Sequence, residues 1–135
     1  MSKNFPKQLT SNIGLFYVCL ELSKLGWNVL LTSRNTKGVD LVIHSQEAKR
    51  THTTQVKSLT GREAANASSL IADFIVICRK VLDCKPEIFI LTKQEAATII
   101  QVRTNKSGKQ SQWLQYRNYE IFRDNNWDKM GSGWD

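Results

Sequence analysis

The chain has 135 residues, a length that fits one compact domain (residues 1–135) and makes two improbable. Its 41% hydrophobic and 23% charged residues exclude a disordered or collagen-like chain. Nineteen Lys and Arg against twelve Asp and Glu give a formal charge of +7, which favours polyanionic partners such as nucleic acid. The sequence shows neither an apolar run of about 18 residues nor a signal-peptide pattern, so we expect a cytoplasmic protein that does not enter a membrane.

An amphipathic helix is predicted between Pro6 and Leu25, because apolar residues recur there at steps of three and four. The apolar stripe consists of Leu15, Val18, Cys19, Leu22 and Leu25. The candidate N-caps are Thr10, Ser11 and Asn12. Gly26 supplies the stop, and the β-rich segment 27–33 predicts a first strand directly after it.

A β-hairpin is predicted next, because the β-rich segments 39–44 and 51–57 flank a polar run. Centred on that run, the simplest register pairs His44 with Thr51, so that Asp40 falls opposite Gln55. Side chains alternate across a strand, and Lys57 therefore shares a face with Gln55. In this register Asp40 lies about 5 Å from Gln55 and about 7–8 Å from Lys57, measured between Cβ atoms.

The second half of the chain is predicted to hold two buried strands, at 73–78 and 87–91, and a helix at 93–103. Residues 61–70 fit a short helix or a loop, which gives the order α-β-β-β-(short α)-β-β-α for a core spanning 9–103. An aromatic C-terminal arm follows at 113–127. Its aromatic side chains could stack on bases, but their three-residue spacing favours packing on the sheet. Residues 131–135 are expected to fray.

The side chains of Asp40, Gln55 and Lys57 suit metal-assisted phosphodiester hydrolysis. Mg²⁺ (or Mn²⁺) prefers oxygen ligands, which Asp40, the Gln55 amide and the Val56 carbonyl would provide. The Lys57 ammonium would orient or deprotonate the attacking water. The alternative is that Asp40 caps the turn after Gly38, while Gln55 and Lys57 form the solvated face of a strand.

At these residues the chain resembles a known group of proteins. Gly38-Val-Asp40, followed by Gln55-Val-Lys57, is similar to the PD-(D/E)XK nuclease-like superfamily in its Asp…Gln-x-Lys variant, as in Mrr-type restriction endonucleases. Archaeal Holliday-junction resolvases resemble the chain in the order of elements. The resemblance covers roughly residues 9–91. It implies an α/β restriction-endonuclease-like fold, with a central mixed β-sheet (α-β-β-β-α-β core) flanked by helices, together with Mg²⁺ and a DNA substrate.

The helix departs from this resemblance. Relatives carry a metal-binding glutamate there, and in many the acid directly follows the glycine, where this chain has Leu15. Glu21 is the acid that remains on the helix, at the border of the apolar stripe, where it could reach the site or simply face water. The leading function is therefore a DNA endonuclease. The rivals are a catalytically inactive nuclease-like module that binds DNA or protein, and a structural or regulatory protein without DNA contact.

Basic side chains near the hairpin are the candidate DNA contacts. They are Arg34, Lys37, Lys49, Arg50 and Arg62. Together they would give a sequence-independent, salt-dependent affinity for phosphates, although each one alone is as well explained by the solubility of a loop. Because cutting both strands of a duplex requires two sites, a homodimer with twofold symmetry is compatible with this function.

Overall fold

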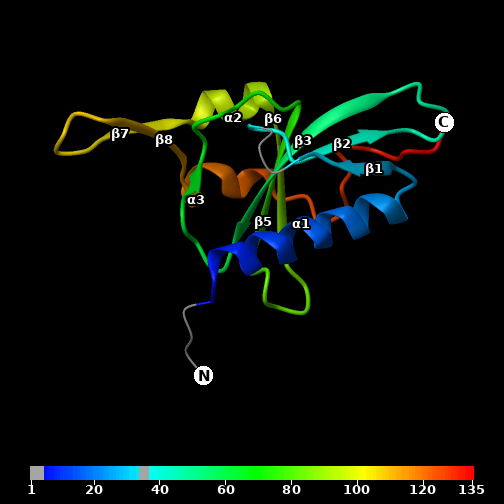
Figure 1. Cartoon of the computed structure of the whole chain (residues 1–135), viewed down its shortest axis with the longest axis horizontal. Helices are drawn as coiled ribbons and strands as arrows, with labels where there is room; N and C mark the ends of the chain where they lie inside the picture. Colours follow the sequence, from blue (N-terminus) through cyan, green and yellow to red (C-terminus); the bar gives the residue numbers. More distant parts are fainter. Residues whose placement is uncertain (1–4, 34–36) are drawn as a thin grey trace.

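The computed structural model describes residues 5–33 and 37–135 and is built around a five-stranded mixed sheet (Figure 1). Its strand order is β1-β2-β3-β5-β6, and a second sheet of three short strands has the order β4-β8-β7. The long helix α1 packs across one face of the main sheet, while α2 and α3 lie on the other. The α/β prediction of a central mixed sheet flanked by helices is confirmed.

Helix α1 (Lys7–Lys24) forms where the apolar spacing predicts it. Val18 and Leu22 are fully buried, and Leu15 and Cys19 pack beside them in the same core cluster. The N-caps were placed wrongly, because the N-cap is Pro6 and the predicted capping residues lie inside the helix. Proline has no N–H to lose at a helix start, so a start at this position leaves no additional donor without a partner.

Strands β1 (Asn28–Leu31), β2 (Leu41–His44) and β3 (Thr51–Leu59) form an antiparallel meander. The predicted hairpin register is confirmed, since His44 pairs with Thr51 and Leu41 with Thr54. Gly38, in the turn before β2, has a φ of +78°, a conformation that L side chains rarely adopt. A Cβ at this glycine would also stand 2.7 Å from the side chain of Ile71. The turn that delivers Asp40 to β2 therefore depends on this glycine.

Strands β5 (Phe74–Arg79) and β6 (Glu87–Thr92) form the buried half of the sheet, with β5 parallel to β3. Both are runs of β-branched and apolar residues because both faces of these strands are covered. Arg79 is only 1% exposed and stands directly opposite Glu87, with which it forms a salt bridge.

The connection after β3 is the loop that was one of its two predicted alternatives, and the connections after β3 and β6 both contain a strand that was not predicted. The segment between β3 and β5 holds no helix in the described residues; instead β4 (Ala65–Asn66) pairs with β8 (Gln110–Leu114). Helix α2 (Lys93–Ile99) ends before the predicted boundary, and β7 (Gln101–Thr104) follows it. The physical reason is the run of β-branched residues at the end of the predicted helix, which favours a strand over a helix.

The C-terminal arm packs on the sheet, as its spacing predicts. It comprises α3 (Tyr116–Tyr119) and the 3-10 turn η1 (Glu120–Phe122). Tyr119 is fully buried against Phe89. Burial is the main reason why the pKa of Tyr119 is raised to about 12.

The last residues do not fray, contrary to expectation. Gly133 donates a backbone hydrogen bond to Leu25 at 2.8 Å and accepts one from Gln46 at 2.9 Å. Asp135 accepts a bond from the Glu47 amide at 2.6 Å and forms an ion pair with Arg50. Residues 133–135, which we call the C-terminal clasp, are thus bound to the β2–β3 turn. Among the helices in the described residues, none is long and apolar enough to cross a membrane.

Candidate functional site

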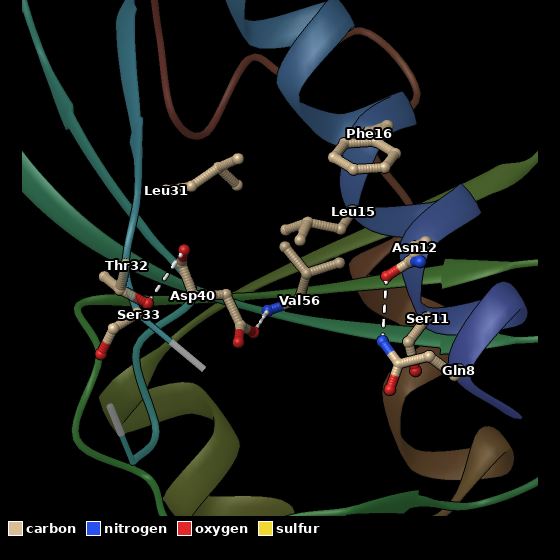
Figure 2. Close-up of a pocket in the computed structure, with 10 residues that line it drawn as sticks. All are labelled: Gln8, Ser11, Asn12, Leu15, Phe16, Leu31, Thr32, Ser33, Asp40 and Val56. Carbon is tan, nitrogen blue, oxygen red and sulfur yellow. Dashed lines mark hydrogen bonds between the residues drawn. The ribbon is translucent and has the colours of Figure 1, made fainter. Parts of the chain in front are cut away.

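Asp40 lies directly before β2, at the end of the segment that connects β1 to β2. Its amide donates to the Thr54 carbonyl at 2.9 Å, and its carbonyl accepts from the Thr32 amide at 3.0 Å, so the ladder extends through it on both sides. Its side-chain Oδ2 accepts a 2.7 Å hydrogen bond from the Val56 amide (Figure 2). The carboxylate is therefore fixed against β3. Its other oxygen, Oδ1, has no hydrogen bond within the described residues.

Gln55 and Lys57 come from β3. The regular pairing ends at Leu41–Thr54, and the next main-chain bond joins the Asp40 amide to the Thr54 carbonyl, one residue out of the register that would set Asp40 opposite Gln55. Gln55 is 7% exposed, and its Oε1 is buried without a hydrogen-bond partner in the described part of the chain. A buried carbonyl oxygen without a partner is costly, so such an atom is a candidate ligand.

Lys57 is partly buried, and two opposing effects act on its pKa. Burial lowers the pKa of Lys57, and the neighbouring charge of Asp40 raises it by less, so the net pKa lies below the ordinary value of 10.5. No hydrogen bond or ion pair joins the side chains of Asp40, Gln55 and Lys57 within residues 5–33 and 37–135. That all three functional groups act on one spot stays a prediction.

A cavity of about 500 Å³ opens beside Asp40, between the first half of α1 and the end of β1. Asp40 and Val56 lie on one side of it, and α1 contributes both polar and apolar side chains on the other (Figure 2). The α1 residues are Gln8, Ser11, Asn12, Leu15 and Phe16. Gln8 donates to Asn12 at 3.1 Å, so these two amides are linked across one helical turn.

Sequence reasoning missed the polar side of this cavity because it assigned Ser11 and Asn12 to a cap. Their spacing from Gln8 and Leu15 places all four on one helical face, which is the signal that could have found them. Leu15 lines the cavity. It stands at the position where many of the nucleases that the chain resembles were expected to carry an acidic residue. The helix therefore presents amide, hydroxyl and apolar groups at this place.

Glu21 points elsewhere. It forms an ion pair with Lys24 at 3.1 Å and accepts a 3.5 Å hydrogen bond from Tyr17. At 1.5 Å rise per residue, it lies about 9 Å further along the helix axis than Leu15. Glu21 is not among the ten residues that line the cavity; neither are Gln55 and Lys57.

The candidate DNA contacts separate into two places. Lys37 and Arg62 are exposed, the first in the turn before Asp40 and the second after the end of β3, where it lies 5.2 Å from the ring centre of Tyr116. Lys49 and Arg50 lie at the opposite end of the hairpin. At about 3.3 Å per residue, Arg50 is about 16 Å along β3 from Gln55. Arg34 lies outside the described residues.

The two basic residues at the hairpin tip have acidic partners. Lys49 pairs with Glu47 at 3.4 Å. Arg50 pairs with Asp135 and lies over the ring of Trp27. These contacts connect the tip to the C-terminal clasp.

The side chains expected to bind a metal ion offer oxygen atoms as ligands. Within the described residues no group of three or more His, Cys, Asp or Glu side chains could hold a metal ion. Oδ1 of Asp40 and Oε1 of Gln55 are oxygens without a hydrogen bond in the described residues, the type of atom that a hard cation prefers, although Gln55 does not line the cavity beside Asp40. His52 packs edge-on between Trp27 and Phe74.

Comparison with known proteins places the fold. No protein-family model matches the sequence, and no curated protein does. Among solved structures, the chain is similar to the bacterial homing endonuclease I-Ssp6803I, with a TM-score of 0.57 and 16% sequence identity. The match covers 88% of this chain and 89% of that one. The chain therefore has a nuclease-like fold, shared with a homing endonuclease across almost its whole length.

Proposed function

We propose that the protein is a metal-dependent DNA endonuclease of the PD-(D/E)XK type, with Asp40, Gln55 and Lys57 as its catalytic residues. The observation that carries the proposal is the buried, unpartnered Oε1 of Gln55, next in the chain to Val56, whose amide holds the Asp40 carboxylate. The nuclease-like fold supports it, because the structural neighbour is a bacterial homing endonuclease.

The residues that would hold Mg²⁺ or Mn²⁺ are Asp40 through Oδ1, Gln55 through Oε1, and Val56 through its carbonyl. When bound, the cation acidifies a water molecule and offsets negative charge on the scissile phosphate. The Val56 amide already occupies Oδ2 of Asp40, which fixes the direction of the free oxygen before any ligand arrives. A site with one carboxylate is weak on its own, so phosphate oxygens of the substrate complete it.

Lys57 has the role of orienting the attacking water and of accepting its proton. A lysine accepts a proton only in its neutral form, and the lowered pKa of Lys57 makes that form available at a lower pH than for an exposed lysine. In its charged form the same ammonium stabilises the negative charge that develops on the phosphate.

Helix α1 supplies no carboxylate in this proposal. Glu21 is engaged with Lys24 and lies away from the cavity, whereas Asn12 and Gln8 face it (Figure 2). Their amide groups suit hydrogen bonds to water or to a phosphate oxygen. In this proposal the catalytic site has one metal-binding carboxylate, and the exposed Lys37 and Arg62 would contact the flanking backbone of DNA.

The test is a cleavage assay on supercoiled and branched DNA, with Mg²⁺, Mn²⁺ or EDTA. The wild type should cut only with a metal, and Asp40→Asn, Gln55→Met and Lys57→Met should each lower the rate at least about a hundredfold. Lys85→Ala, an exposed substitution purified in the same way, controls for contaminating nucleases. Binding without cutting in every condition would refute catalysis and establish the inactive DNA-binding module. A homodimer would show as coordinated cutting of both strands.

A further inference from the structure

The hairpin of β7 and β8 projects from the body of the molecule as a narrow ribbon, at the end opposite the β2–β3 turn (Figure 1). Residues 102–110 are all exposed. The register pairs Val102 with Gln112 and Thr104 with Gln110, so these four exposed side chains share one face. The ribbon buries little, and folding alone does not explain its length.

The charged side chains of the ribbon and its flanking segments are all basic. From Ala96 to Tyr119 the sequence contains no Asp or Glu. The same stretch contains four basic residues, Arg103, Lys106, Lys109 and Arg117. Lys106 and Lys109 lie in the turn at the tip and have no ion pair within the described residues. In contrast, Lys49 and Arg50 at the far end of the molecule both have acidic partners.

Hydrogen bonds hold the ribbon in one shape. Asn105 Oδ1 accepts bonds from the amides of Ser107 and Lys109 at 3.0 and 2.9 Å, which closes the turn. At the base, Trp113 donates to Ser111 at 2.7 Å, and Arg103 lies over the Trp113 ring. A ribbon fixed in this way presents its side chains without a large loss of conformational entropy on binding.

The base of the ribbon is joined to the Asp40 end of the sheet. The chain leaves β3 shortly after Lys57, pairs with β8 through Ala65 and Asn66, and then packs against Gly38 through Ser69 and Ile71. Gly38 is two residues before Asp40. One short stretch of chain, residues 65–71, therefore contacts both the root of the ribbon and the turn that precedes Asp40.

We infer that the β7–β8 ribbon enters the major groove of duplex DNA beside the catalytic site. The inference rests on the proposed function, which identifies the ligand as DNA, and adds which segment of the protein contacts the base pairs. The major groove, about 12 Å wide, admits a two-stranded ribbon. Lys106 and Lys109 contact phosphates at the groove edge. The Gln, Thr and Val side chains of the exposed face meet base edges, where glutamine suits adenine and apolar groups suit the thymine methyl.

The experiment measures binding to a duplex in EDTA by fluorescence anisotropy, over a series of salt concentrations. The test variant is Lys106→Ala/Lys109→Ala, and Lys24→Ala/Lys85→Ala is the charge-matched control. We expect the slope of log affinity against log salt to fall by about 2 in the test variant only, because each phosphate contact contributes about 0.9. Equal slopes for the two variants would overturn the inference.

Groove entry is tested with the same duplex carrying glucosylated 5-hydroxymethylcytosine, whose sugar fills the major groove. Wild-type affinity should fall at least about tenfold, and double-stranded RNA, with its deep and narrow major groove, should bind no better than the modified duplex. Unchanged affinity for the modified duplex would overturn the inference. Melting curves and light scattering confirm that the variants keep the fold and oligomeric state.

These outcomes separate the two proposals. Ribbon-dependent binding without cutting at any metal concentration supports the inference and refutes catalysis. Metal-dependent cutting, together with DNA binding that does not depend on the ribbon, supports catalysis and refutes the inference. A wild type that binds no duplex at low salt refutes both.

Discussion

The carboxylate of Asp40 and the main-chain amide of Val56 are joined by a 2.7 Å hydrogen bond that ties the start of β2 to the middle of β3. The bond continues the sheet for one step beyond the main-chain ladder, which ends with Asp40 donating to Thr54. Asp40 therefore has a structural role as well as the proposed ligand role. Substitutions can separate the two.

Asp40→Asn and Asp40→Ala should differ in their free energy of unfolding but show the same loss of cutting activity. The amide oxygen of asparagine can still accept from Val56, whereas alanine leaves that donor without its partner. We expect Asp40→Ala to lower the free energy of unfolding by about 1–3 kcal/mol and Asp40→Asn by much less. Both should abolish metal-dependent cutting. Denaturant titration measures the first effect, and an Asp40→Asn protein as unstable as Asp40→Ala would show that the hydrogen bond is not what matters.

Gln55→Met should keep or raise stability while it abolishes cutting. The methionine side chain has nearly the same shape, and it removes a buried oxygen that has no hydrogen-bond partner. Removing such an oxygen should stabilise the metal-free protein by up to about 1–3 kcal/mol. The check is the unfolding midpoint in EDTA. A large loss of stability would mean that Oε1 has a structural partner and is not reserved for a ligand.

Lys57→Met should be more stable than the wild type at neutral pH, by an amount that shrinks as the pH rises. The folded-state pKa of Lys57 is lowered, first of all by burial, so the unfolded chain binds more protons between that pKa and the unfolded value of about 10.4. Wild-type stability therefore rises with pH across this window, and the variant lacks the rise. Urea unfolding of both proteins between pH 7 and 10.5 tests this; parallel curves would contradict it.

Leu15→Glu should strengthen metal binding, since Leu15 lines the cavity beside Asp40. A second carboxylate at this place should tighten Mn²⁺ binding by about tenfold, because cation affinity follows the number of charged ligands. Leu20→Glu is the control: Leu20 is on the same helix and 53% exposed but does not line the cavity. Isothermal titration of both variants gives the comparison. Equal affinities would show that the helix does not face the metal.

Gly133→Ala should destabilise the protein, although a terminal glycine would ordinarily tolerate a methyl group. A Cβ at Gly133 would collide with the backbone of Gly26 and Trp27, where the C-terminal clasp crosses the helix end. Overpacking of this kind costs about 1–3 kcal/mol. The thermal midpoint tests it, and an unchanged midpoint would show that the tail is not clasped in solution.

The meander could be predicted from the sequence because the pattern that produces it lies within a short stretch of chain. The pairing of His44 with Thr51 follows from two β-rich segments around one polar turn, and the predicted register holds as far as Leu41–Thr54. At Asp40 the main-chain bond to Thr54 departs from it by one residue. The core stripe of α1 follows in the same way from helical periodicity. Both patterns lie within short stretches of chain.

The features that the sequence did not predict depend on contacts between distant residues. Strand β4 has only two residues and exists because β8 pairs with it. The C-terminal clasp rests on Gly133 reaching Leu25, and no local pattern signals that contact. The lining of the cavity by Asn12 depends on how α1 lies over β1 and β3. Propensity and periodicity contain no information about such distant partners.

The most direct test of the central claim is Mn²⁺ binding to the wild type, Asp40→Asn and Gln55→Met, each with DNA present and measured by electron paramagnetic resonance. The account predicts that the wild type binds the ion and that both variants bind it at least about tenfold more weakly. Equal binding by all three proteins, or none by the wild type, would contradict the claim that Asp40 and Gln55 together hold a metal ion.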